Sequence, residues 1–178
     1  MARFAVTGFG ADRPGIVAAV TGVLVEWGGN LEDSAMTILG GHFAMMLIVE
    51  VTDDVAVTQL EQSLAERGAP LGLSVAVRPA ADPGAGEPVD GASWSVSVHG
   101  ADHPGIVHRV TQLLADRGAN VVDLSTRVVE GEPPAYVLRL SVVVPTTIDP
   151  DSLGAELVAL AGELEVDVRL RPDEPDIL

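Results

Sequence analysis

Two short loops carry residues whose types and spacing suit the binding of a small charged molecule. The first reads GADRPGI at residues 10–16 and the second reads GADHPGI at residues 100–106. Asp12 and Asp102 each supply a carboxylate, which can accept hydrogen bonds from an ammonium group. The N–H groups at the start of the helix expected after each loop have no partner within that helix and can face a carboxylate. The loops therefore suit a small polar ligand that needs both acceptors and donors.

A polar residue follows each loop at the same distance. These residues are Asn30 and Asn120, and each offers one donor and one acceptor group, so either can bind a donor or an acceptor of a polar ligand. They also follow Gly28 and Gly118, and asparagine tolerates the left-handed backbone of a turn after a helix. The ligand and turn interpretations both stay open at this point.

The aspartates have a structural interpretation as well. Asp12 and Asp102 stand two residues before a proline, and an aspartate there is a common N-cap of a helix. One carboxylate can serve both as a cap and as a ligand contact. Gly10 and Gly15 lack a Cβ, so we expect them to let the backbone approach a ligand.

Histidines near the second loop raise the alternative of a metal site or an acid–base pair at residues 99–103. His99 and His103 flank Asp102, but the first copy has Phe9 and Arg13 at the histidine positions, so the pair is not part of the repeated feature. The chain has no cysteine, and neither loop is a Walker loop or a dinucleotide fingerprint. We therefore expect no catalytic residue, no metal and no cofactor.

The two loops belong to a longer internal repeat. Residues 10–33 align without gaps on residues 100–123, and thirteen of the 24 positions are identical. A shared helical period would reproduce apolar positions, but it would not reproduce Asp, Pro, Gly and Asn in a fixed order. The chain therefore contains a duplicated unit.

Hydrophobic periodicity predicts the same order of elements in both halves. Period-2 alternation predicts a strand before each loop, as in WSVSVHG at 94–100, and helical spacing of apolar residues follows each proline. Gly40-Gly41 predicts a tight hairpin between the next two strands of the first half. A second helix and a last strand complete each half. The order β-α-β-β-α-β, twice, predicts an α+β protein of two ferredoxin-like domains, each a four-stranded antiparallel sheet with both helices on one face.

Composition places the boundaries of these domains. Residues 81–91 are rich in Pro and Gly and lack apolar periodicity, so they are the expected linker between a domain at 1–80 and a domain at 92–172, with a tail at 173–178. The strand expected around Met45 and Met46 is apolar on both faces, which predicts burial by a second layer, such as another of these domains.

Charge and hydropathy bear on partners and location. Ten arginines against 26 acidic residues give a formal net charge of −16, and no arginine cluster interrupts the acidic sequence, so we expect no direct binding to nucleic acid. No apolar run approaches the length of about 18 residues that a membrane span needs. The start of the chain reaches Asp12 and Pro14 too soon for a signal peptide, so we expect a cytoplasmic protein with no membrane partner.

These residues carry a family resemblance. A strand, then Gly-x-Asp-x-Pro-Gly-Ile-Val, a helix ending in Gly-x-Asn and a following β-β-α-β resemble the ACT domain, a small-molecule-sensing regulatory module of amino-acid metabolism. Two such modules without a catalytic or DNA-binding domain are similar to the tandem ACT group of the glycine cleavage system transcriptional repressor. The resemblance extends from Arg3 to Arg171.

The resemblance implies a ligand site. In ACT domains that bind amino acids, the ligand lies at an interface between two modules, held by the loop after the first strand and by a polar residue after the first helix. The matching positions are Gly10, Ala11, Asp12, Arg13, Pro14, Gly15, Ile16 and Asn30 in the first copy, and Gly100, Ala101, Asp102, His103, Pro104, Gly105, Ile106 and Asn120 in the second. The loop residue that is often Asn in such relatives is Asp here, and an ionised Asp donates no hydrogen bond.

The resemblance also implies a function. It is that of a regulator without enzymatic activity, which senses a small amino acid and relays occupancy to a protein partner such as a transcriptional regulator, in control of glycine cleavage or related amino-acid metabolism. A homo-oligomer such as a dimer is expected. The alternative is a ligand-free dimerisation or scaffold module. Because Arg13 of the first copy aligns with His103 of the second, the two sites are expected to differ.

Overall fold

The computed structural model describes residues 1–80, 90–131 and 134–173, and the chain divides into two compact units, Met1–Glu87 and Pro88–Leu178. Each unit is described by itself. Most of the predicted linker at 81–91, and the predicted tail after Asp173, lie outside the described residues. The predicted domain boundaries therefore stay predictions.

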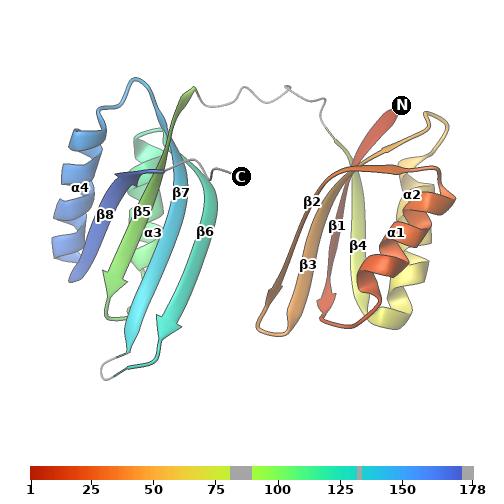
Figure 1. Ribbon diagram of the computed structural model, residues 1–178, viewed down its shortest axis with the longest axis horizontal. Coiled ribbons are helices and arrows are strands. Elements are labelled where there is room, and N and C mark those ends of the chain that lie inside the picture. Colours follow the sequence, from red (N-terminus) through yellow and green to blue (C-terminus); the bar gives the residue numbers. More distant parts are fainter. Residues whose placement is uncertain (81–89, 132–133, 174–178) are drawn as a thin grey trace. The chain divides into compact units, whose positions relative to one another are not determined.

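The first unit is one four-stranded antiparallel sheet with two helices on one face (Figure 1). The strand order is β2-β3-β1-β4. Its elements are β1 (Ala2–Ala11), α1 (Ile16–Glu26), β2 (Asn30–Leu39), β3 (His42–Val51), α2 (Val57–Gly68), the short 3-10 helix η1 (Ala69–Leu71) and β4 (Leu73–Pro79).

The second unit repeats this topology, with the strand order β6-β7-β5-β8. Its elements are β5 (Gly91–Gly100), α3 (Ile106–Asp116), β6 (Asn120–Val129), β7 (Ala135–Pro145), α4 (Pro150–Glu163) and β8 (Val166–Pro172). Even the irregularity in the edge strand recurs, between Leu31 and Asp33 in β2 and between Val121 and Asp123 in β6. The predicted pair of ferredoxin-like βαββαβ units is confirmed.

Several local signals act as predicted. Gly40 and Gly41 form the hairpin turn of the first unit with positive φ angles of 58° and 79°. Asp149 caps α4, because its carboxylate accepts hydrogen bonds from the backbone N–H groups of Asp151 and Ser152. The loop-facing end of α1 differs slightly from the prediction, because the helix begins at Ile16, two residues after Pro14.

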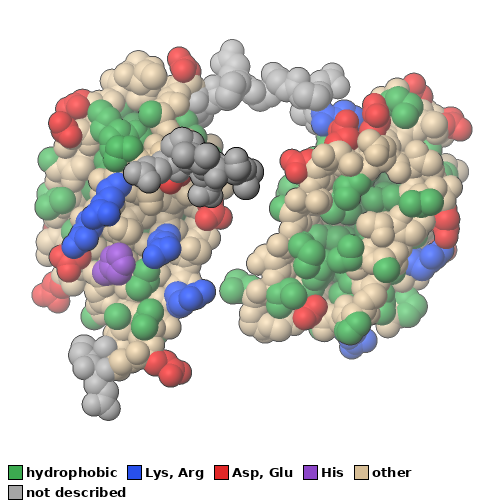
Figure 2. All heavy atoms as spheres, in the orientation of Figure 1, with side chains coloured by type: hydrophobic (Ala, Val, Ile, Leu, Met, Phe, Trp, Pro, Cys, Tyr) green, Lys and Arg blue, Asp and Glu red, His purple; other side chains and the backbone are tan. Residues whose placement is uncertain are grey.

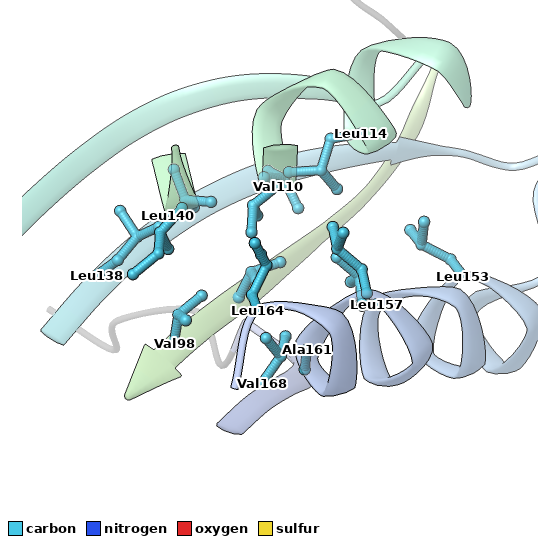
Figure 3. Close-up of a cluster of buried hydrophobic side chains, with 14 of the residues drawn as sticks. Val98, Val110, Leu114, Leu138, Leu140, Leu153, Leu157, Ala161, Leu164 and Val168 are labelled. Carbon is cyan, nitrogen blue, oxygen red and sulfur yellow. The ribbon is translucent and has the colours of Figure 1, made fainter. Parts of the chain in front are cut away.

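Each unit has its own apolar core between its helices and the face of the sheet that they cover. In the second unit, Leu114 of α3 and Leu157 of α4 lie over Leu138 and Leu140 of β7, all four at most 1% exposed (Figure 3). The first unit has an equivalent cluster around Leu60 and Leu64 of α2. Among the described residues no polar or charged side chain is buried, so hydrophobic burial is the main source of stability.

Within its own unit the strand β3 is buried on one face only, and the second layer expected over its other face stays a prediction. Met45 points toward the helices and is 7% exposed, whereas Met46 points to the opposite face and is 54% exposed. Successive side chains of a strand point to opposite faces, and the helices cover one of them. The edge strand β2 is exposed along its whole length, including Met36 on its helix-facing side.

No helix in the described part of the chain is long and apolar enough to cross a membrane.

Candidate functional site

The loop after the first strand has the same geometry in both units. Gly15 and Gly105 adopt left-handed conformations with φ of 95° and 100°, and α1 and α3 begin at the next residue. Only glycine adopts this conformation without strain. The turn directs the first N–H groups of each helix, which have no partner within the helix, toward the loop.

The loop aspartates do not cap the helices, so that interpretation is wrong. The residues at the N-cap positions are Gly15 and Gly105, and no side chain caps either helix. Asp12 is anchored through its backbone instead, because its N–H donates to the carbonyl of Gly41 at 3.0 Å. Within the described residues the exposed carboxylates of Asp12 and Asp102 accept no hydrogen bond. Both are available to a ligand.

The first loop lines an open depression of about 530 Å³. Asp12 and Arg13 stand at the loop side of it, and side chains from other elements extend it. The lining residues are Asp12, Arg13, Pro14, Gly15, Ile16, Val17, Ala18, Thr21, Met36 and Phe43. The structure thus brings five of the predicted residues together, from Asp12 to Ile16. Sequence reasoning missed Thr21, Met36 and Phe43. Helical period relates Thr21 to Val17, but no local pattern relates Met36 of β2 to the loop.

The first glycine of each loop has a packing role, and its predicted ligand role stays a prediction. A Cβ on Gly10 would lie 2.6 Å from the carbonyl oxygen of Gly72, and one on Gly100 would lie 2.6 Å from Cγ1 of Val166. Both contacts are shorter than real Cβ contacts allow, so glycine here permits close strand packing. Around Gly15, by contrast, the space that a Cβ would fill is open, and its positive φ is the constraint.

Asn30 lies far from the loop of its own unit. It pairs with Glu50 at one end of β3, whereas Ala11, at the start of the loop, pairs with His42 at the other end. These partners stand eight positions apart in β3, which corresponds to about 27 Å at the usual rise per residue. Asn120 and Gly100 are separated in the same way, since they pair with Val143 and Tyr136 of β7. No single unit can therefore place its loop and its asparagine on one small ligand.

The second copy of the site has more polar surroundings. Tyr136 occupies the position of Phe43, because Tyr136 pairs with Gly100 as Phe43 pairs with Gly10. Burial raises the pKa of the Tyr136 phenol above its usual value, and the negative charge of Asp102 raises it further. The neutral phenol therefore lies within electrostatic reach of the loop carboxylate of Asp102. The first unit has no such hydroxyl at this position, because Phe43 stands there.

His103 also distinguishes the two loops. Its Nε2 lies 2.6 Å from the carbonyl oxygen of Leu164 and its Nδ1 lies 3.3 Å from that of Pro104. Two carbonyl acceptors are both satisfied only when both ring nitrogens carry protons. These two hydrogen bonds raise the pKa of His103 above its ordinary value, and the bond to Leu164 has the larger effect. The imidazolium ties the loop to the end of α4, whereas Arg13 lines the depression of its unit.

The raised pKa of His103 makes the stability of the second unit depend on pH. The protonated ring stabilises the folded state fully below the unfolded pKa of about 6.5, and this contribution is lost as pH rises through the higher folded pKa. We expect the melting temperature of wild type to exceed that of His103→Ala most at about pH 5.5, with the difference shrinking toward pH 8. Melting curves across this range, with NMR titration of the His103 ring, measure it.

His108→Ala is the matched control, because His108 is exposed on α3 and is absent from these hydrogen bonds. Its difference from wild type should not follow the same pH course. A wild-type advantage over His103→Ala that grows with pH would contradict the assignment of a protonated ring.

The histidines of the second loop do not converge on a metal. His99 lies on the face of the sheet away from the helices, where it pairs with Val137 and Asp167, whereas His103 turns to Leu164. No group of three or more His, Asp or Glu side chains in the described ranges is arranged to hold a metal ion.

Comparisons with known proteins bear on the family. A model described as ACT domain matches residues 3–78, and a second ACT domain model matches residues 94–162. The glycine cleavage system transcriptional repressor of Escherichia coli is 31% identical over 163 residues, which cover 89% of this chain and 84% of the repressor. A UPF0237 protein of Methanopyrus kandleri is 44% identical over 79 residues, or 44% of this chain and 88% of that protein.

A solved structure covers both units. The crystal structure of an unknown protein from Galdieria sulphuraria has a TM-score of 0.81 and 28% identity, over 97% of this chain and 99% of that one. Two ACT models, a relative matched over most of the chain and the repeated βαββαβ fold agree with one another. The chain belongs to the ACT-domain family, as a tandem ACT protein related to the glycine cleavage system transcriptional repressor.

Proposed function

We propose that this chain is a regulator without enzymatic activity that binds a small amino acid at its two ACT loops and relays occupancy to a protein partner. One observation carries the proposal. In both units an aspartate whose carboxylate accepts no hydrogen bond in the described structure stands beside the N-terminus of a helix, and in the first unit this pair borders a depression. The carboxylate suits the ammonium of an α-amino acid, and the helix N–H groups suit its carboxylate.

The separation of loop and asparagine shapes the mechanism that we propose. Since Asn30 lies about 27 Å from the loop of its own unit, the asparagine that contacts a ligand has to come from another ACT module. A ligand held by two modules favours the arrangement in which they meet, and this difference in affinity is the signal. The exposed apolar residues Met36 and Ile38 of β2 support association of modules along this edge.

The partner is proposed from the relative. Because the Escherichia coli relative is named as a transcriptional repressor of the glycine cleavage system, we propose that this chain acts on glycine cleavage or related amino-acid metabolism. The formal charge of −16 disfavours direct contact with DNA, so a transcriptional regulator is the proposed partner.

A melting screen against the twenty amino acids tests the proposal. A ligand at 100 times its dissociation constant stabilises the folded state by about 2.7 kcal/mol, which raises the melting temperature of a chain of this length by about 5–10 °C. We expect one or a few small amino acids to give such a rise, and size-exclusion chromatography to show tighter association in their presence. A flat response to all twenty would favour a ligand-free scaffold.

A further inference from the structure

The face of the second sheet that the helices leave uncovered carries a cluster of arginines. Four of the ten arginines of the chain lie on it: Arg127 in β6, Arg139 in β7, and Arg169 and Arg171 in β8. Figure 2 shows these arginine side chains in blue, gathered with a histidine on this face. The arginines are far apart in the sequence, so the expectation that no arginine cluster interrupts the acidic surface is wrong for this sheet.

The strand register orders the cluster into rows that cross the sheet. The middle row runs Arg169, Ser97, Arg139, Ser125 from β8 to β6. One flanking row runs Asp167, His99, Val137, Arg127, and the other runs Arg171, Ser95, Ser141, Asp123. The two aspartates occupy edge strands at opposite corners of this array, and the middle row contains no carboxylate.

The charges of this cluster are not neutralised within the described structure. The four arginines Arg3, Arg67, Arg109 and Arg117 form ion pairs with glutamates elsewhere on the two units. Arg127, Arg139, Arg169 and Arg171 have neither an ion pair nor a hydrogen bond to any described side chain. Four guanidinium groups on one face, unpaired among the described residues of a chain of net charge −16, are available to an anion.

The first unit lacks the cluster at the same positions. Its row equivalent to Arg169, Ser97, Arg139 and Ser125 is Ala76, Thr7, Met46 and Ala35, by the matching register of the two sheets. The fold therefore does not require arginine here. Arg78, which corresponds to Arg171, is the single position of the four that keeps its arginine in the first unit.

The surface beside two of the arginines, Arg127 and Arg139, is hollowed. A depression of about 330 Å³ is lined by His99, Ser125, Thr126, Arg127, Val129, Val137 and Arg139. Strands lie about 4.8 Å apart, so the Cα atoms of Arg139 and Arg169, on either side of β5, are about 10 Å apart. Guanidinium groups at this spacing reach an anion two or three phosphoryl groups long, and the serine hydroxyls of the middle row can donate hydrogen bonds to its oxygens.

We propose that this face of the second sheet binds a compact polyanion with two or more phosphoryl groups, such as a small polyphosphate or the phosphate chain of a nucleotide. Arginine binds phosphate oxygens in a bidentate manner, so a phosphoryl chain matches the row better than a single charge does. A long nucleic acid fits less well, because it would extend past the cluster onto acidic surface and His99 is the single aromatic side chain on the described part of this face. The site is separate from the proposed amino-acid loops.

Isothermal titration with inorganic triphosphate, and with sulfate at the same ionic strength, tests the proposal. We expect wild type to bind triphosphate more tightly than sulfate, and the double variant Arg139→Gln, Arg169→Gln to bind it at least ten-fold more weakly. Arg127→Gln should weaken binding as well. Arg78→Gln on the first sheet is the matched control and should leave binding unchanged. Circular dichroism confirms that the exposed substitutions leave the fold intact.

Further titrations distinguish the sources of the anion. Equal affinity for ATP and triphosphate would identify the phosphate chain as sufficient, and much tighter binding of ATP would identify a nucleotide; both support the proposal. Absence of triphosphate binding at millimolar concentration, or an equal loss in Arg78→Gln, would overturn it. Tighter binding of a glutamate-rich peptide or of single-stranded DNA would also overturn it, in favour of a macromolecular partner.

Discussion

Replacing both loop aspartates, Asp12→Ala together with Asp102→Ala, is expected to abolish the rise in melting temperature that an amino acid gives in wild type. Neither carboxylate caps a helix or accepts a hydrogen bond within the described structure, so the substitution removes the acceptor for the ligand ammonium without removing an internal contact. Loss of a charge-assisted hydrogen bond of about 1.5–3 kcal/mol at each loop weakens binding by more than ten-fold. The measurement is the ligand-induced shift in melting temperature, followed by titration calorimetry.

Two further variants make this test specific. Asp90→Ala removes an exposed carboxylate just before β5, whereas the second loop follows the other end of that strand, so this variant should preserve the full shift. The single variants Asp12→Ala and Asp102→Ala should differ in affinity, since Phe43 borders the first loop and Tyr136 the second. If the double variant keeps the ligand-induced shift of wild type, the loops are not the site, and the function proposed for them fails.

The largest loss of stability is expected from Leu157→Ala. This side chain is 1% exposed in the core of the second unit, where it packs with residues of α3 and β7 (Figure 3). Truncation removes buried apolar surface and leaves a cavity that the surrounding core fills only in part, so we expect a loss of about 2–5 kcal/mol in the free energy of unfolding. Urea unfolding followed by circular dichroism measures it.

The neighbouring residue provides the control. Val158 lies on the same helix and is 60% exposed, so Val158→Ala should change the free energy of unfolding by less than about 0.5 kcal/mol. Equal effects of the two substitutions would mean that α4 does not pack on the sheet with the face that the structure assigns to it.

Much of the fold was predictable because its signals are local. Apolar periods of two and of about 3.6 residues follow from strand and helix geometry, and Gly40-Gly41 and Asp149 act through their own backbone and neighbouring N–H groups. The repeat of residues 10–33 at 100–123 added an independent copy of each signal. The apolar run of β3 did not reveal which of its faces the helices cover, and the structure shows that this is the face of Met45.

The site was predictable in part. The loop residues from Asp12 to Ile16 lie together because they are adjacent in the chain. The structure excluded the cap role of Asp12, because Gly15, with a positive φ, occupies the N-cap position of α1 and no side chain caps the helix. Gly10 was assigned to ligand approach but packs against Gly72, a contact between residues 62 positions apart. Such a contact depends on strand pairing, which the loop sequence does not contain.

The sequence by itself determined the duplicated ACT module and its two aspartate loops, because these depend on residue types and spacings within short segments. Only the tertiary structure decided that Asn30 stands at the far end of the sheet from its loop, and that four scattered arginines share one face. Both results follow from strand register. A β-sheet places residues side by side according to pairing between distant segments, and pairing is a property of the folded chain.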